Sequence, residues 1–313
     1  MTTPPPGDAR PRVLGVDVGG TTVKARLVEI GRSDRPLWER RVPTPRDDHD
    51  GLGTAATVAG LVDAARGVGR VDAVGLVVPG IVDDDAGTAV ASTNVGFRDA
   101  PLRALVERAS SLPVGFGQDV RAGALAEAAT GAGAGVSGGL AFVPVGTGLA
   151  AAVVDRGVAL VAGGWAGEIG QVVLTSGRLA GLRVEEVASA GGLARRTGAA
   201  NALAVVARVR AGEPEASAAW RELVEVLADC LAWIAAVAAP TTLVVGGGLA
   251  GAGAVLFDPL GSALDERLAH SRRPALVPAA HGDGAAMVGA ALLAEQALHD
   301  RGALETLPAG GAA

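Results

Sequence analysis

The sequence is poor in cysteine, lysine and aromatic residues. Its 313 residues include one cysteine, Cys230, one lysine, Lys24, and no tyrosine. A single thiol cannot form an intramolecular disulfide bond, and it also excludes a zinc site built from four cysteines. Stability must therefore come from an apolar core, for which 49% hydrophobic residues are sufficient.

Basic charge is also scarce. The chain carries 27 Lys and Arg residues against 33 Asp and Glu residues, and its arginines are scattered. Binding to a phosphate backbone needs concentrated basic side chains, so we expect no nucleic-acid partner. The four histidines lie in polar or terminal segments, which gives little support to Ser-His-Asp or Cys-His hydrolysis. They are His49, His270, His281 and His299.

Long hydrophobic runs are missing as well. No stretch reaches about 18 apolar residues without Gly, Pro or charge, so we expect no membrane span. Residues 1–11 are polar and proline-rich and lack the apolar run of a signal peptide. We expect a cytoplasmic protein with a disordered tail over 1–11 and a second one from about Glu305.

Two glycine-rich turns are the most informative feature that is present. Residues 17–22 (DVGGTT) and 144–148 (PVGTG) each follow an apolar strand and precede a second one. Each turn can present backbone N–H groups and a threonine hydroxyl to a phosphate without obstruction by side chains. Two such turns about 125 residues apart suggest a cleft that closes on a polyphosphate from both sides.

Periodicity of apolar residues predicts an α/β protein. The glycine-dense segment 131–139 separates two halves that repeat the order strand, glycine turn, strand, helices. Residues 79–83 are interpreted as a turn. Strands are predicted over 13–16, 23–30, 73–78, 114–116, 140–143, 150–154 and 243–245, and helices over 52–67, 101–109, 121–130, 220–239 and 284–298.

Two aspartates follow predicted strands and have two interpretations each. Asp17 precedes the first glycine turn, where its carboxylate can hold Mg²⁺ directly or through water, or belong to an ordinary tight turn. Asp119 lies just before a predicted helix, where it can be an N-cap or a base that accepts a hydroxyl proton during phosphoryl transfer. The presence of the second turn favours the first interpretation of Asp17, in which the glycine turn binds phosphate and the carboxylate holds Mg²⁺.

Other polar and glycine-rich positions complete the set. Glu168 lies in a glycine-flanked loop that also holds Gln171, and Glu185 opens a further helix; carboxylates and amides suit a polyhydroxylated ligand. A solvated helix start is the alternative for Glu185. Gly246, Gly247 and Gly248 follow a strand and can approach a nucleotide. Their spacing and the lack of a ribose-binding acid fit a dinucleotide-binding dehydrogenase poorly.

In order and spacing, these motifs resemble the ROK family (repressors, uncharacterised frames and sugar kinases) of the actin-like ATPase superfamily. The resemblance covers residues from about 12 to about 298. The matching segments are 17–24 (DVGGTTVK), 78–83 (VPGIVD), Asn94 with 97–107, 118–127 (QDVRAGALAE), 143–154, 166–171 (AGEIGQ), 184–189 (VEEVAS) and 244–249 (VVGGGL).

The resemblance implies two ribonuclease-H-like α/β domains with a cleft between them. The smaller would comprise 12–118 with about 286–304, and the larger 119–285. It also implies a homodimer, ATP with Mg²⁺ at Asp17, Asp119 as the catalytic base, and sugar contacts from Asn94, Gln118, Glu168, Gln171 and Glu185. The implied ATP contacts are Asp17, Gly19, Gly20, Thr21, Thr22, Lys24, Gly146, Thr147, Gly148, Gly246, Gly247 and Gly248.

Two departures from the family pattern concern the sugar side. The typical zinc loop, three cysteines and a histidine, is missing: Gln171 stands in place of the histidine, and residues 175–183 contain no cysteine. We therefore expect no zinc and a loop ordered by packing alone. Gln118 replaces the asparagine that usually precedes the catalytic aspartate, which adds one methylene beside the sugar.

The function that this resemblance implies is ATP-dependent phosphorylation of a hexose at its 6-hydroxyl, as in a glucokinase. Mannose, fructose or an N-acetylated hexosamine are alternative substrates. A sugar-sensing regulator is a rival, but such members carry a helix-turn-helix module, and only about a dozen residues precede the first predicted strand. A non-catalytic sugar-binding or nucleotide-binding protein is a third alternative.

Overall fold

The computed structural model describes residues 10–32 and 35–302, which form two compact units. Unit 1 contains the described residues up to Ala122 and those from Ala286 onward, and unit 2 contains Gly123–Ala285. The division falls inside helix α3 (Asp119–Thr130), and the segment 131–139 lies within unit 2. The tail predicted from Glu305 lies outside the described residues, as do residues 1–9 of the tail predicted at the N-terminus.

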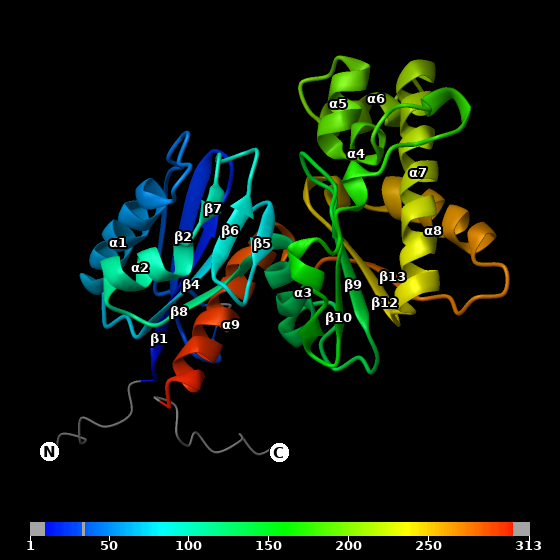
Figure 1. Ribbon diagram of the computed structural model, residues 1–313. Coiled ribbons are helices and arrows are strands. Elements are labelled where there is room, and N and C mark those ends of the chain that lie inside the picture. The colour runs from blue at the N-terminus through cyan, green and yellow to red at the C-terminus, as the bar shows by residue number, and fades with distance from the viewer. Residues whose placement is uncertain (1–9, 33–34, 303–313) are drawn as a thin grey trace, which may run out of the picture. The chain divides into compact units, whose positions relative to one another are not determined.

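A five-stranded sheet in the order β3-β2-β1-β4-β8 forms the centre of unit 1 (Figure 1). Strand β1 pairs antiparallel with β2, as predicted, and parallel with β4. The strands are β1 (Arg12–Val18), β2 (Thr22–Glu29), β3 (Trp38–Pro43), β4 (Ala73–Val78) and β8 (Val114–Gln118). The edge strand β3 escaped prediction because its exposed, charged residues give no apolar signal.

Helices cover both faces of this sheet. On one face, α1 (Leu52–Arg66) and α2 (Leu102–Ser110) bury their apolar side chains against β1 and β4. On the other face lies the C-terminal helix α9 (Ala285–Asp300). The helices predicted over 52–67, 101–109 and 284–298 are thus confirmed to within two residues at their ends.

Three glycines in register make room for α9. Gly15, Gly75 and Gly115 lie side by side on β1, β4 and β8. A Cβ atom at Gly75 would overlap the carbonyl oxygen of Ala290, and one at Gly115 would overlap that of Leu293. The helix backbone therefore rests directly on the sheet, which only glycine permits.

A small antiparallel sheet of β5 (Ile81–Asp83), β6 (Thr88–Ala91) and β7 (Arg98–Ala100) completes unit 1. The interpretation of 79–83 as a turn was wrong for residues 81–83, which pair with β6. Strands of three or four residues are too short to show an alternating pattern.

Unit 2 repeats this topology with a sheet in the order β11-β10-β9-β12-β13. An antiparallel hairpin is again extended by two parallel strands, so the predicted repeat of topology is confirmed. The strands are β9 (Leu140–Pro144), β10 (Ala152–Asp155), β11 (Val158–Ala159), β12 (Thr242–Gly246) and β13 (Ala275–Pro278).

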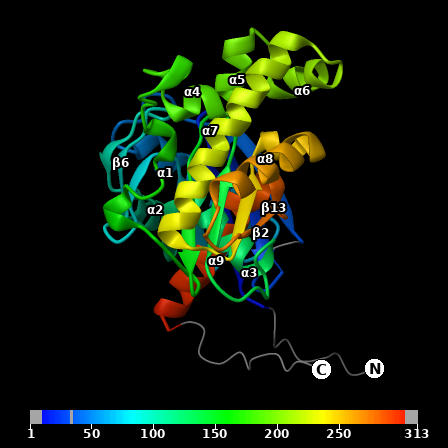
Figure 2. The same ribbon diagram turned by 90° about the vertical axis from the view of Figure 1, so that its right-hand side faces the viewer.

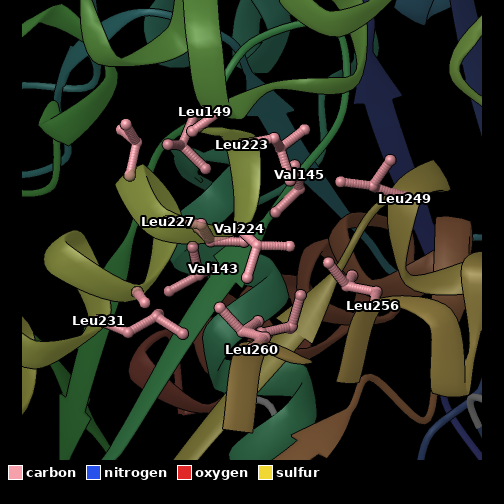
Figure 3. Close-up of a cluster of buried hydrophobic side chains, with 14 of the residues drawn as sticks. Val143, Val145, Leu149, Leu223, Val224, Leu227, Leu231, Leu249, Leu256 and Leu260 are labelled. Carbon is pink, nitrogen blue, oxygen red and sulfur yellow. The ribbon is translucent and has the colours of Figure 1, made fainter. Parts of the chain in front are cut away.

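The long helix α7 (Pro214–Ala238) supplies more buried residues to the core of unit 2 than any other element. Its Leu223, Leu227 and Leu231 pack on β9 and on α8, as Figure 3 shows. Helices α7 and α8 lie side by side (Figure 2). The sequence placed the start of α7 at Trp220, six residues too late, because alanines fill its first buried positions.

Shorter helices complete unit 2: α4 (Val184–Ala188), α5 (Ala190–Thr197), α6 (Ala202–Arg210), α8 (Ala254–Arg267) and the turns η1 (Ala162–Gly164), η2 (Ile169–Gln171), η3 (Gly177–Leu179), η4 (Gly248–Ala252) and η5 (Gly282–Gly284). Within residues 10–32 and 35–302, no helix has both the length and the apolar character needed to cross a membrane.

Candidate functional site

The first glycine turn joins β1 to β2 and is held from two sides. Its own Gly19 N–H donates to the carbonyl of Thr22 at 3.0 Å. The buried Thr44, just after β3, donates its hydroxyl to the carbonyl of Gly19 at 2.6 Å and its N–H to Thr21 at 3.1 Å. The turn is thus held by a hydrogen bond of its own and by two from Thr44. Thr44 was missed because its role depends on strand pairing and not on a local motif.

Asp17 is buried at the end of β1, opposite Lys24 on β2. The Lys24 ammonium lies 3.4 Å from its carboxylate. Burial raises the pKa of Asp17 above its ordinary value, and the charge of Lys24 opposes this shift. A buried carboxylate beside a phosphate-binding turn fits Mg²⁺, which takes one or two protein carboxylates and completes its shell with substrate phosphates and water.

Asn94 lies directly against the first turn. A Cβ atom at Gly20 would be 3.2 Å from the Cβ of Asn94, so the two backbones approach closely. Close by in sequence, the hydroxyl of the buried Ser92 has no hydrogen-bond partner among the described residues. The structure therefore brings one predicted sugar contact, Asn94, to the predicted phosphate turn.

Asp119 and Gln118 lie where β8 ends and α3 begins. The side-chain oxygen of Gln118 accepts the N–H of Arg121 at 2.8 Å, three residues on, as an N-capping residue does. The Asp119 carboxylate instead accepts the N–H of the adjacent Val120 at 2.8 Å. The capping interaction that the sequence offered for Asp119 is thus made by the side-chain oxygen of Gln118.

Asp17 and Asp119 lie at the same edge of one sheet. Strands β1, β4 and β8 are parallel, and both carboxylates follow or end a strand at its carboxyl end, with β4 between them. Two strand spacings place these backbone positions roughly 10 Å apart. Both candidate carboxylates therefore lie at one end of the central sheet of unit 1.

Arg121 anchors the start of α3 and was missed from the sequence. Its buried guanidinium donates to both oxygens of Asp84, at 2.8 and 3.1 Å, and to the carbonyl of Val82 at 3.0 Å. This bidentate pair ties the small sheet to the helix that begins with Asp119. An arginine two residues after a candidate base was the only signal available in the sequence.

The second glycine turn, in unit 2, is supported by the corner between α4 and α5. Gly146 donates its N–H to the carbonyl of Gly148 at 3.1 Å. The hydroxyl of Ser189 donates to the carbonyl of Thr147 at 3.1 Å, and Gly191 donates to the carbonyl of Gly146 at 3.2 Å. The turn is therefore held through its own backbone carbonyls, which accept hydrogen bonds from Ser189 and Gly191.

The third glycine segment lies against the second turn. Gly247 has a φ of 73°, and a Cβ there would come within 2.6 Å of the Val145 carbonyl oxygen. Val145 donates to the carbonyl of Gly246 at 2.9 Å and accepts the N–H of Leu249 at 3.2 Å. The structure thus joins Gly146–Gly148 and Gly246–Gly248 into one glycine-lined surface of unit 2.

Glu185 and Gln171 lie beside this surface. A Cβ at Gly148 would be 3.0 Å from a carboxylate oxygen of Glu185, and one at Gly170 would be 3.1 Å from the Cβ of Glu185. Arg183 donates to the side-chain oxygen of Gln171 at 2.9 Å and forms an ion pair with Glu185 at 3.0 Å. The structure therefore brings Gln171 and Glu185 together through an arginine that sequence reasoning did not single out.

Glu168 is positioned by the glycine that precedes it. Gly167 has a φ of 97°, and a Cβ there would overlap the carbonyl oxygen of Ala151, so the loop lies against the chain just before β10. The N–H of Ala151 donates to the carbonyl of Gly167 at 2.9 Å. Glu168 then begins the short turn η2, which ends at Gln171.

Comparison with known proteins gives one consistent result. The ROK family model matches residues 13–297. The chain is 29% identical over 279 residues to a glucokinase of Halalkalibacterium halodurans, covering 79% of this chain and 83% of that one. It is 28% identical over 305 residues to an N-acetyl-D-glucosamine kinase of Escherichia coli, covering 89% and 98%.

A solved structure has the same fold. The ROK family glucokinase of Streptomyces griseus, in complex with glucose and AMPPNP, superposes with a TM-score of 0.76 at 29% identity. The match covers 91% of this chain and 99% of that one. With the family model spanning both units, the chain belongs to the ROK family and has the two-domain α/β fold of the actin-like ATPases.

Proposed function

We propose that this chain is an ATP-dependent sugar kinase that transfers the γ-phosphoryl group to the 6-hydroxyl of a hexose. One observation carries the proposal: a glycine turn that follows a buried carboxylate, and that Thr44 holds by a hydrogen bond, shares a sheet edge with a second carboxylate, Asp119. The resemblance to chains named glucokinase and N-acetyl-D-glucosamine kinase supports it.

In this mechanism each unit binds part of the substrates. The turns Gly19–Thr22 and Gly146–Gly148 hold phosphate oxygens through backbone N–H groups other than those of Gly19 and Gly146, which close the turns themselves. Gly246–Gly248 lies against the nucleoside. Asp119, at the first residue of α3, accepts the proton of the hydroxyl that attacks phosphorus. Mg²⁺ carried by ATP would neutralise phosphate charge, with Asp17 as its protein ligand. Lys24 beside Asp17 completes the ATP contacts.

The sugar contacts that the family resemblance implies are Asn94 and the amide of Gln118 in unit 1, and Glu168, Gln171 and Glu185 in unit 2. Together they offer donors and acceptors to several hydroxyl groups, as a polyhydroxylated ligand requires. Glucose is the proposed substrate; mannose, fructose and N-acetylated hexosamines are the alternatives.

The test is a panel of hexoses and amino sugars with Mg-ATP, followed by coupled detection of ADP, on the wild type and on Asp119→Asn. We expect phosphorylation of one sugar class and a loss in kcat of roughly 10²–10⁴-fold in the variant, the usual contribution of a general base. Nucleotide affinity should stay nearly unchanged. Asp48→Asn is the matched control, because Asp48 caps α1 through the N–H groups of Gly53 and Thr54.

Two outcomes would contradict the proposal. Loss of only a few-fold in Asp119→Asn would mean that Asp119 is a structural residue at the start of α3. Failure of every sugar with the wild type would favour a regulator or a sugar-binding protein without catalysis, in which case calorimetry with the same sugars should still detect binding.

We also propose that the kinase is a homodimer in the cytoplasm, where ATP is available, with no nucleic-acid partner. The family resemblance supports the dimer, and the low content of basic residues supports the absence of nucleic-acid binding. Sedimentation equilibrium at micromolar concentration distinguishes a dimer from a monomer.

A further inference from the structure

The loop between Gln171 and Glu185 is folded into a short hairpin without cysteine. Val173 pairs with Arg183 across it, Leu174 donates to the carbonyl of Leu182 at 2.9 Å, and Val184 donates to that of Val172 at 2.8 Å. The expectation that packing alone orders this loop is incomplete, because charged side chains fasten it at two points.

Arg183 makes the first attachment, at the base of the hairpin. Its Nη1 lies 2.9 Å from the side-chain oxygen of Gln171 and 3.0 Å from a carboxylate oxygen of Glu185. Its backbone N–H donates to Glu186 at 2.7 Å, which holds the arginine at the start of α4. One guanidinium thus bridges the two ends of the loop.

Glu222 on α7 makes the second attachment, at the tip of the hairpin. Its two carboxylate oxygens pair with Arg178 in η3 and with Arg196 at the end of α5. The Glu222 side chain is mostly buried, and Arg196 is the better shielded of its two partners, because the side chain of Arg178 is 75% exposed. The loop is therefore connected to helices α5 and α7 through Glu222, in addition to the contacts that Arg183 makes within the loop.

We infer that Arg183 is a positioning residue for the sugar, which fixes the side-chain oxygen of Gln171 and one oxygen of Glu185 so that their remaining groups face the ligand. In this chain the guanidinium bridge occupies the loop in which a zinc cluster is typical of the family. The inference rests on the proposed function, because it takes Gln171 and Glu185 as sugar contacts.

The geometry of arginine suits this role. A planar guanidinium offers five donors in a fixed fork, so it can hold an amide oxygen and a carboxylate at once. The second oxygen of Glu185 is the one nearest to Gly148 of the second phosphate turn. The bridge thus leaves that oxygen on the side of the proposed substrates.

The experiment compares Arg183→Ala, Arg183→Lys and the wild type in steady-state kinetics with glucose and ATP varied separately. We expect the KM for the sugar to rise about 10-fold or more in Arg183→Ala, the effect of losing about 1.4 kcal/mol. The KM for ATP and kcat should each stay within a few-fold. Arg183→Lys keeps the charge but can make only one of the two contacts. Its KM for sugar should therefore lie between that of the wild type and that of Arg183→Ala.

Arg273→Ala is the matched control, because Arg273 also forms an ion pair in unit 2, with Asp265 at 2.9 Å, and both partners are exposed. It should leave all constants unchanged. An unchanged KM for sugar in Arg183→Ala, or an equal loss for sugar and ATP, would overturn the inference. If Arg183→Ala does not fold, a KM for sugar in Arg183→Lys equal to that of the wild type overturns it.

The two proposals fail in different ways. If the wild type phosphorylates no sugar of the panel, the proposed function fails before any variant is compared. If the wild type is active and Arg183→Ala keeps its KM for sugar, the kinase assignment survives and only the positioning role of Arg183 is wrong.

Discussion

Asp17 combines burial with charge, which is unfavourable for stability and useful for binding a cation. Burial raises its pKa above the ordinary 3.8, so the folded state binds its proton more tightly than the unfolded state does. The stabilisation from the protonated form is complete below pH 3.8 and is lost as pH rises through the raised pKa. Above that raised pKa the ionised carboxylate therefore lowers the free energy of unfolding.

We expect Asp17→Asn to raise Tm at pH 7 and to give no such gain below pH 3.8, where the aspartate is neutral in both states. Activity should fall by a factor of at least about 10², as when one electrostatic contact to a transition state is removed. Thermal unfolding across pH and coupled assays measure both effects. Asp63→Asn, at an exposed aspartate on α1, is the control and should change neither. A lower Tm in Asp17→Asn at pH 7 would contradict this account.

At the scale of single elements, the contact of α9 with its sheet depends on three small residues. The row Gly15, Gly75 and Gly115 brings the helix backbone to the strand backbones, and side chains cannot adapt where the neighbour is a carbonyl group. The stripe was not recognised in the sequence, because each glycine lies in a different strand and the register places them side by side.

Gly75→Ala should therefore lower the free energy of unfolding by about 3 kcal/mol, at the upper end of the range for overpacked cores. Gly60→Ala is the matched control: Gly60 lies within α1 and a Cβ there would meet nothing within 4 Å. It should raise the free energy of unfolding by about 0.5–1 kcal/mol, because alanine favours a helix. Urea unfolding of both variants measures these free energies of unfolding. Equal changes in the two variants would refute the packing argument.

At the scale of the whole molecule, we expect the chain to fold without bound zinc, because residues 171–185 contain no cysteine. Among the described residues, no group of three or more His, Cys, Asp or Glu side chains could hold a metal ion. The ion pairs of Arg183 and Glu222 occupy the loop instead. The fold of unit 2 should consequently be independent of zinc.

We expect the purified protein to contain less than stoichiometric zinc by elemental analysis. A chelator should remove activity only by removing Mg²⁺, so an excess of Mg²⁺ should restore it fully, and Tm should not change. Tightly bound zinc, or a loss of Tm with a zinc-selective chelator, would show that residues 171–185 have been misinterpreted.

Local signals were enough to predict the strands on both sides of each glycine turn, the main helices and the repeat of topology. These features depend on residues close in sequence: apolar periodicity, turn-forming glycines, and a proline that begins or ends a helix. The candidate residues Asp17 and Asp119 were singled out in the same way, because each follows a predicted strand, whereas Asn94 came from the family resemblance.

The sequence by itself thus determined which segments become strands and turns and which carboxylates follow them. Only the tertiary structure decided which groups each side chain contacts. In it Gln118 caps α3, Thr44 holds the first turn, and Arg183 bridges Gln171 and Glu185. The physical reason is that a side chain's partner depends on strand register and on the direction in which the chain returns, and neither is encoded in local spacing.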